Sequence, residues 1–261
     1  MKKKVKQEKF CIKGFSTQKP LEKPEENQDA FAINSDKGIF VISDGASSTP
    51  RSGLWSRILT QNFIKNENII KKSRTKGYSK WLEESRKEWE EKAEIEKLPK
   101  IIQIKLEKSK GSASTFLGCI YSKIKTKNKL KIIYIGDSCF FLIRNRKIAV
   151  AIPFKKSEQF DSNPKVLRSL EGGGGEKNLK TKNIELKADD TIIVATDEVG
   201  QWILSRKEKG EQPWRELENL TEKKFEKLIE KIRKNKQVDE DDMSVIIFKI
   251  TKKYEKITDY I

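Results

Sequence analysis

The chain has 261 residues, of which 35% are hydrophobic and 36% are charged, and its formal net charge is +17. This length can bury a substantial core, and we expect a single domain across residues 1–261. The sequence contains no histidine, which excludes Ser-His-Asp and Cys-His nucleophile systems and leaves carboxylates to carry any chemistry.

The first predicted elements are a pair of strands and a helix. The apolar runs Ala30–Asn34 and Ile39–Ser43 are separated by a short turn, which is typical of a hairpin. Beyond the loop 46–53, apolar residues recur at helical spacing over Leu54–Phe63. We therefore expect two paired strands followed by a helix.

The segment 65–110 is highly charged and is predicted to be helical. One face of this segment carries residues spaced four apart: Trp81, Ser85, Trp89 and Ala93. Such a stripe is typical of the buried face of an amphipathic helix. A platform on which nucleic-acid bases stack is the alternative, but helical spacing of the aromatic residues favours burial.

Apolar strands return after residue 110. Four are predicted in succession: Ala113–Ser122, Leu130–Ile135, Phe140–Arg144 and Ile148–Ile152. Because the connections between them are short, we expect a meander in which each strand pairs with the next.

Residues 153–182 are rich in turn-forming residues and are predicted to leave the sheet as a candidate flap, with a short helix around Val166–Leu170. A phosphate-binding P-loop is not favoured in this segment. The glycine run that ends at Gly175 is followed by Glu176 rather than by the required Gly-Lys-Ser/Thr.

The last predicted elements are a strand over Thr191–Ala195, a helix over Trp214–Ile232 and a strand over Ser244–Ile250. No internal repeat or linker divides the chain, which agrees with a single domain.

The positive charge favours an anionic partner, such as a phosphoprotein, a nucleic acid or a membrane surface. Lysines are spread along the chain rather than gathered with aromatic residues, so we do not expect a nucleic-acid surface. Cys11, Cys119 and Cys139 form no C-x-x-C pair and are predicted to be buried, reduced thiols. Without a signal sequence or a membrane-spanning run, a cytoplasmic protein with no membrane partner is expected.

Aspartates recur where the predicted strands begin or end. Asp44, Asp137 and Asp197 each follow a strand, and Asp241-Asp242 precedes the last one. Aspartate is also common in ordinary turns, which is the structural alternative for each residue taken singly. If the strands lie side by side, however, the carboxylates form an oxygen-rich site of the kind that Mg²⁺ or Mn²⁺ prefers.

Short motifs around these aspartates occur in a fixed order along the chain. They are Asn27-Gln28-Asp29-Ala30, Val41-Ile42-Ser43-Asp44-Gly45, Gly111-Ser112-Ala113-Ser114-Thr115, Ile135-Gly136-Asp137-Ser138, Ala195-Thr196-Asp197 and Asp241-Asp242-Met243-Ser244. In this order they resemble the type 2C metal-dependent protein phosphatases. The resemblance runs from about Gly14 to Ile250.

The resemblance implies an α+β fold, an αββα four-layer sandwich in which helices flank two central antiparallel sheets. It also implies two Mn²⁺ or Mg²⁺ ions and a third, weaker one. Asp44 would bridge the two metals, and the carbonyl oxygen of Gly45 would ligate one of them. Asp197 and Asp241 would hold the other metal, and Asp137 would join Asp197 at the third site.

The implied activity is hydrolysis of phosphoserine and phosphothreonine in proteins by a metal-activated water. Asp44 and Asp29 are the implied catalytic residues, with Asp29 ligating or orienting the metal-bound water. Lys23 or Lys19 would bind the substrate phosphate where relatives have an arginine. A phosphorylated protein, with a cognate serine/threonine kinase, is the expected partner.

The sequence departs from the family pattern at three further positions. Gln28 replaces a common glutamate, Ala46 a common histidine, and Glu198 a common glycine. These departures keep open a catalytically silent phosphatase fold that binds a phosphoprotein or a kinase. A metal-dependent nuclease is a third alternative, but no nuclease motif supports it.

Overall fold

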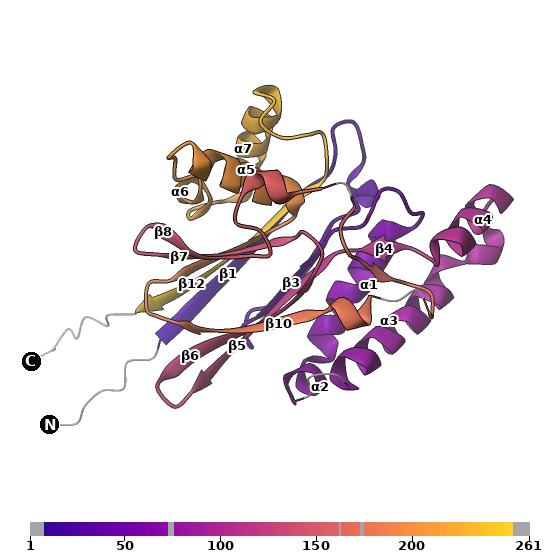
Figure 1. Ribbon diagram of the computed structural model, residues 1–261, viewed down its shortest axis with the longest axis horizontal. Coiled ribbons are helices and arrows are strands. Elements are labelled where there is room, and N and C mark those ends of the chain that lie inside the picture. Colours follow the sequence, from indigo (N-terminus) through magenta and orange to yellow (C-terminus); the bar gives the residue numbers. More distant parts are fainter. Residues whose placement is uncertain (1–7, 73–75, 162, 173–174, 253–261) are drawn as a thin grey trace, which may run out of the picture.

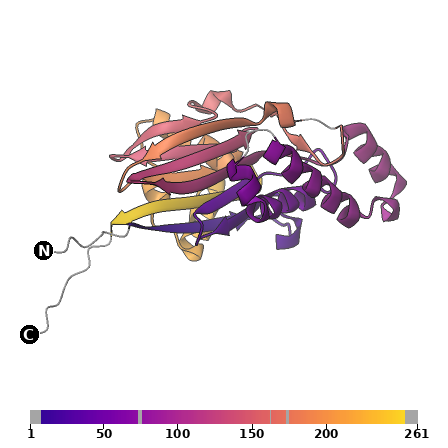
Figure 2. The ribbon, with the colours of Figure 1, turned by 90° about the horizontal axis from the view of Figure 1, so that it is seen from below.

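The computed structural model describes residues 8–72, 76–161, 163–172 and 175–252. Two antiparallel sheets pack against each other, and helices cover the outer face of each sheet (Figure 1). Seen from below, the helices of the first half of the chain lie on one side of the strands and those of the second half behind them (Figure 2). The predicted αββα sandwich is confirmed.

Each large sheet contains five strands among the described residues. The first sheet has the order β1 (Glu8–Thr17), β12 (Met243–Lys252), β11 (Thr191–Ala195), β7 (Cys139–Arg144) and β8 (Lys147–Ile152). The second has the order β10 (Lys180–Leu186), β6 (Lys127–Ile135), β5 (Phe116–Ile124), β3 (Ile39–Ser43) and β2 (Ala30–Asn34). A separate two-stranded sheet pairs β4 (Ala113–Ser114) with β9 (Leu167–Arg168).

The helices form two groups. On the second sheet lie α1 (Ser52–Lys65), α2 (Glu67–Lys72), α3 (Lys76–Ala93) and α4 (Lys100–Ser109), and on the first lie α5 (Asp197–Glu208), α6 (Trp214–Leu217) and α7 (Glu222–Lys234). Short 3-10 turns occupy Pro24–Glu26, Ile95–Lys97, Ser157–Gln159 and Glu176–Asn178. Helix α4 extends beyond the edge of the strands (Figure 2).

The strand sequences are apolar because both faces of each sheet are covered. In β3, Ile39 and Val41 pack under the first group of helices, whereas Phe40 and Ile42 pack against the opposite sheet. This alternation follows from the two-residue period of a strand. The predicted hairpin of β2 and β3 and the helix that follows them are confirmed.

The predicted stripe on α3 is buried, and the alternative of a base-stacking platform is therefore wrong. Trp81 and Trp89 are both 0% exposed. The Trp81 ring lies 5.8 Å from the ring of Phe63 and 4.7 Å from that of Phe116, centroid to centroid. The tryptophans thus join the helical layer to the second sheet.

Three predicted elements differ in the structure. The meander is wrong because β6 and β7 belong to different sheets, so the chain crosses between the sheets at Gly136-Asp137. The helix expected around Val166–Leu170 is strand β9, which pairs with β4. The single helix over Trp214–Ile232 is two helices, because the extended backbone of Thr221 starts a new one.

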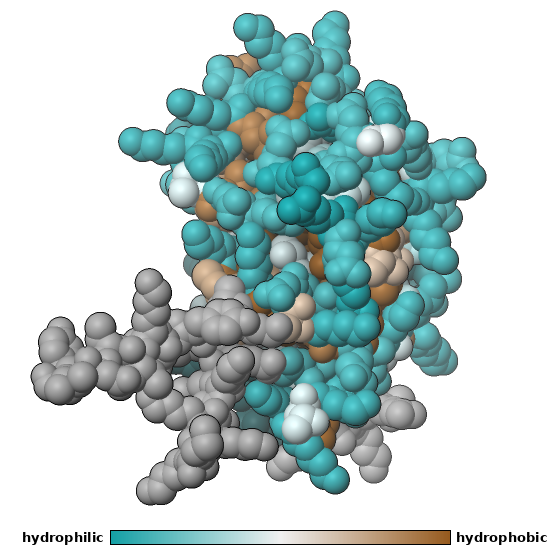
Figure 3. All heavy atoms as spheres, turned by 90° about the vertical axis from the view of Figure 1, so that its left-hand side faces the viewer, coloured by the Kyte–Doolittle hydropathy of each residue, from teal (hydrophilic) through white to brown (hydrophobic). Residues whose placement is uncertain are grey.

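One face of the molecule carries mainly polar side chains (Figure 3). Hydrophilic side chains surround scattered apolar ones on the face seen in Figure 3. Cys119 and Cys139 are buried as predicted, but Cys11 is exposed, because it alternates along β1 with Phe10 and Ile12, which pack against the core between the sheets. In the described part of the chain, no helix is long and apolar enough to cross a membrane.

Candidate metal centre

The aspartates singled out in the sequence lie at strand ends of both sheets. Asp44 follows β3 and Asp137 follows β6, while Asp29 directly precedes β2. Asp197 is the first residue of α5, after β11, and Asp241 lies just before β12. The stacking of the sheets is therefore what gathers residues from distant parts of the chain.

Asp44 is the electrostatic centre of this group. Its pKa is raised well above the ordinary aspartate value, first by burial and then by the surrounding negative charges. Those charges belong to Asp197, Asp29, Asp137 and Asp241. Because like charges disfavour one another's ionised forms, the group as a whole calls for a positive counter-charge.

Asp29 is held by residues of the opposite sheet. The Thr196 hydroxyl donates a hydrogen bond of 3.0 Å to Asp29 Oδ2, and the same hydroxyl oxygen accepts one of 3.0 Å from the Ser244 backbone N–H. Burial, followed by the charges of Asp197 and Asp242, raises the pKa of Asp29 well above its usual range. This carboxylate is thus fixed in position.

Asp137 and Asp197 have smaller shifts of the same sign. Burial is the largest cause in both, and it raises the pKa of Asp137 to about 7 and that of Asp197 to about 6. Asp197 Oδ1 accepts a hydrogen bond of 2.9 Å from the Glu198 backbone N–H. Asp137 Oδ1 is buried and has no hydrogen-bond partner among the described residues, which marks it as an oxygen with ligating capacity to spare.

Asp241 faces a cation of this chain. Its Oδ1 lies 3.0 Å from Lys19 Nζ. Partial burial lowers the pKa of Lys19, but the hydrogen bond to Asp241 and the charge of that residue raise it by more, so the pKa of Lys19 is raised overall. Lys23, by contrast, is exposed, and its backbone N–H bonds to Glu26 Oε2 at 2.7 Å. Of the two lysines proposed for the substrate phosphate, the structure brings Lys19 to the aspartates and does not bring Lys23.

Asp242 has a different position from its neighbour Asp241. Its Oδ1 accepts from the Lys19 backbone N–H at 2.9 Å, and its Oδ2 accepts from the Gln28 backbone N–H at 2.8 Å. The residue is only 3% exposed. Asp242 therefore ties the start of β12 to the loop that carries Lys19 and Asp29.

Gly45 lies where no side chain fits. A Cβ atom at this position would approach the carbonyl oxygen of Gln28 to 2.7 Å and the carbonyl carbon of Ser52 to 2.8 Å. The backbone N–H of Gly45 donates to the same Gln28 oxygen at 3.2 Å. Glycine is thus required for the close packing of the turn that presents Asp44.

Buried hydroxyl groups beneath Asp44 were not assigned a role from the sequence. Ser114 Oγ donates to the Asp44 carbonyl oxygen at 2.6 Å, and the Thr115 backbone N–H donates to it at 2.9 Å. Thr115 Oγ1 also lies 2.8 Å from Ser138 Oγ, next to Asp137. The run of small hydroxyl residues in Gly111–Thr115 was the available signal, because strand interiors rarely hold so many without partners.

Two of the residues that depart from the family pattern, Gln28 and Glu198, form hydrogen bonds close to the aspartates. Gln28 Oε1 accepts from Ser47 Oγ at 2.6 Å, and Ser47 Oγ accepts from Lys19 Nζ at 2.8 Å, so Gln28 supports the lysine. Glu198 Oε2 accepts from the Asp239 backbone N–H at 3.0 Å, which holds the loop before β12. Burial, as the largest cause, raises the pKa of Glu198 to about 7.

The donor set fits a hard divalent cation in its chemistry. All the candidate side-chain ligands are carboxylates, they are wholly or partly buried, and their charges oppose one another. As they stand, no three acidic or cysteine side chains in the described ranges lie close enough together to hold an ion. The site therefore offers ligands of suitable chemistry for such a cation.

Two antiparallel sheets stack face to face, with helices outside and aspartates at the strand ends. The sequence profile of protein phosphatase 2C matches residues 20–237, and the chain belongs to that family. No curated protein sequence gave a significant match.

Solved structures with the same fold include bacterial serine/threonine phosphatases. Phosphatase PstP of Mycobacterium tuberculosis has a TM-score of 0.64 at 11% identity, covering 93% of this chain and 99% of that one. A PstP catalytic domain in complex with 2 manganese ions has a TM-score of 0.60 at 12% identity, covering 94% and 100%. PppA, described as a regulatory component of the type VI secretion system in Pseudomonas aeruginosa, has 0.63 at 13%, covering 93% and 98%.

Proposed function

We propose that the protein hydrolyses phosphoserine and phosphothreonine in a protein substrate with Mn²⁺ or Mg²⁺ as cofactor. The observation that carries the proposal is that the charges of Asp197 and Asp241, which flank strands of the first sheet, act on the carboxylate of Asp44 at the end of a strand of the second sheet. When bound, two such cations would supply a nucleophile near neutral pH and stabilise charge on the phosphoryl group. The family membership supports the same activity.

The candidate residues would have different roles, some holding the cations and one orienting the water. Asp44, with the Gly45 carbonyl oxygen, would hold both cations together, and Asp197 and Asp241 would complete one ligand set. Asp29, fixed by Thr196, would orient the attacking water. Asp137, with its unpartnered oxygen, would hold a third ion with Asp197. Because Ala46 stands where relatives have a histidine, water would supply the proton that the leaving serine oxygen takes up when its bond to phosphorus breaks.

The decisive experiment measures hydrolysis of p-nitrophenyl phosphate and of phosphothreonine peptides with Mn²⁺, with Mg²⁺ and with a chelator. We expect turnover with either metal and a loss of at least about 100-fold in the chelator, because the cations supply the nucleophile and the charge stabilisation. Equal rates in all three conditions would contradict the mechanism. Inactivity combined with binding of phosphopeptides would favour the catalytically silent module instead.

Lys19 is expected to bind the substrate phosphate, since its amine lies 3.0 Å from Asp241 and 2.8 Å from Ser47 Oγ. Replacing it by alanine (Lys19→Ala) should lower kcat/KM about 10-fold, the effect of losing roughly 1.4 kcal/mol of a charge-assisted bond. Steady-state kinetics on a phosphopeptide measure this. Lys23→Ala is the matched comparison. A larger loss of kcat/KM from Lys23→Ala than from Lys19→Ala would contradict the assignment of the phosphate to Lys19.

A further inference from the structure

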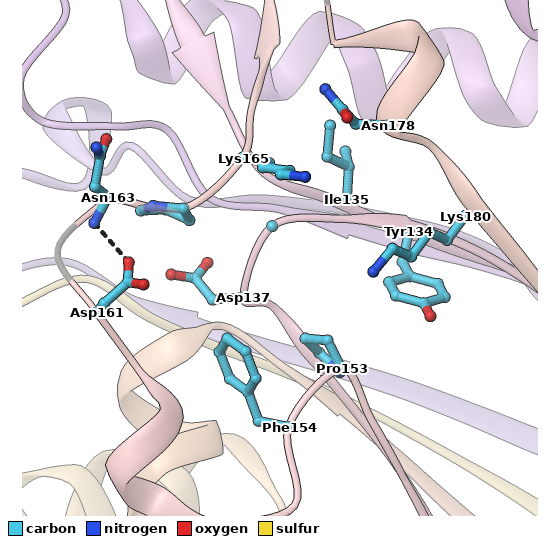
Figure 4. Close-up of a pocket in the computed structure, with 12 residues that line it drawn as sticks. Tyr134, Ile135, Asp137, Pro153, Phe154, Asp161, Asn163, Lys165, Asn178 and Lys180 are labelled. Carbon is cyan, nitrogen blue, oxygen red and sulfur yellow. Dashed lines mark hydrogen bonds between the residues drawn. The ribbon is translucent and has the colours of Figure 1, made fainter.

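A cavity of about 260 Å³ opens beside Asp137. Its walls come from the end of β6, from Pro153 and Phe154 after β8, from the segment 163–165 and from the start of β10 (Figure 4). We call it the Asp137 cavity. Because Asp137 also belongs to the group of aspartates around Asp44, the cavity adjoins the candidate metal centre.

Interactions with the helical layer anchor one wall of the cavity. Strand β9, just beyond Lys165, pairs with β4, and Trp55 Nε1 donates a hydrogen bond of 2.9 Å to the Leu167 carbonyl oxygen. Arg86 Nε donates to the Arg168 carbonyl oxygen at 3.1 Å, and Arg86 forms an ion pair with Glu176. The segment is thus held where it can shape a binding site.

Aromatic packing anchors the opposite wall. The rings of Phe154 and Phe160 lie 4.8 Å apart in a nearly perpendicular contact, and both pack against the core beneath α5. Phe154 and Pro153 present apolar surface to the cavity. Both walls are therefore fixed by contacts outside the cavity, and the space between them is part of the fold.

The end of the cavity farther from the candidate metal centre is lined by two lysines and favours an anionic ligand. In Figure 4 the amine of Lys165 points toward Ile135 and the amine of Lys180 lies beside the ring of Tyr134, away from Asp161. Within the described residues neither lysine forms an ion pair, whereas Lys127, on the strand next to β10, pairs with Glu185 at 3.0 Å. At the other end Asp161 faces Asp137, so the cavity has an acidic end at the metal centre and a basic end beyond it.

We infer that the Asp137 cavity binds an anionic side chain of the substrate, within two residues of the phosphorylated serine or threonine. The inference rests on the proposed phosphatase function. A pocket for a drug-sized ligand measures roughly 300–1,000 Å³, so this smaller cavity suits one side chain. An extended peptide advances about 3.3–3.6 Å per residue, so two residues span about 7 Å, which is roughly the width of a cavity of this volume.

The test compares phosphothreonine peptides that differ at the neighbouring positions, which carry glutamate, glutamine or phosphoserine. Wild-type protein should show a kcat/KM about 2- to 5-fold higher for the anionic peptides than for the glutamine peptide, as expected for charge pairs with exposed lysines. In a Lys165→Ala/Lys180→Ala variant the ratio should fall to about 1. The Lys223→Ala/Lys227→Ala variant, with equal charge loss on the exposed face of α7, should keep the wild-type ratio.

Hydrolysis of p-nitrophenyl phosphate, which has no neighbouring residue, should be unchanged in both double variants. If phosphoserine raises kcat/KM more than glutamate does, the cavity binds a second phosphate group. If the two raise it equally, the cavity binds either anion. No discrimination by active wild-type protein, or a preference that survives Lys165→Ala/Lys180→Ala, would overturn the inference alone. If the wild-type protein hydrolyses none of these substrates, that result counts against the proposed function. Fluorescence anisotropy of labelled peptides would then test the same preference as a difference in binding affinity.

Discussion

Replacing Asp44 by asparagine (Asp44→Asn) should reduce metal-dependent hydrolysis by at least about 100-fold. Even residues that only orient metal ligands contribute about 10- to 100-fold to metal affinity or activity. Asp44 is the carboxylate on which the charges of the other candidate ligands act. The rate on p-nitrophenyl phosphate at saturating Mn²⁺ measures the effect. Asp36→Asn is the matched control because Asp36 is an exposed turn residue far from the aspartate group.

Thermal unfolding gives Asp44→Asn a second, independent readout. The raised pKa of Asp44 means that ionising it costs stability as the pH rises, and an asparagine avoids that cost. Without metal the variant should melt higher than wild type, by about 2–4 °C for each kcal/mol regained. Added Mn²⁺ should stabilise wild type and not the variant. If Asp44→Asn kept both its activity and its stabilisation by Mn²⁺, Asp44 would not be a ligand of the metal centre.

Truncating Trp81 (Trp81→Ala) should be the most destabilising single change in the helical layer. The side chain is 0% exposed, packs against Phe63 and Phe116, and its Nε1–H donates to the Leu59 carbonyl oxygen at 3.3 Å. A large-to-small change at such a position costs about 3–5 kcal/mol of unfolding free energy. Urea denaturation followed by circular dichroism measures this cost.

Ile101→Ala on α4 provides the control for Trp81→Ala, because Ile101 is 71% exposed and makes little core contact. Its unfolding free energy should change by no more than about 0.5 kcal/mol. If Trp81→Ala were equally mild, the tryptophan stripe would not be part of the core, and a surface role for this face of α3 would return.

Local patterns predicted the elements in which buried residues recur at a regular period. The apolar strand β3 and the stripe on α3 were identified correctly because burial repeats at the period of each element. The edge strands β1 and β10 and the helix α5 were not predicted. Most residues of β10 are exposed, so it lacks the apolar pattern that marks a strand, and only its pairing with β6 defines it.

The sequence by itself determined the kind of chemistry available to this protein. It contains no histidine, and its aspartates stand at strand ends within ordered motifs, which restricts the site to oxygen ligands and hard cations. Only the tertiary structure decided which residues meet. Thr196 reaches Asp29 from 167 positions away, and Lys19, not Lys23, reaches Asp241, because the stacking of two sheets places these residues at a common edge. Contacts of that kind depend on the packing of whole layers, which no local pattern encodes.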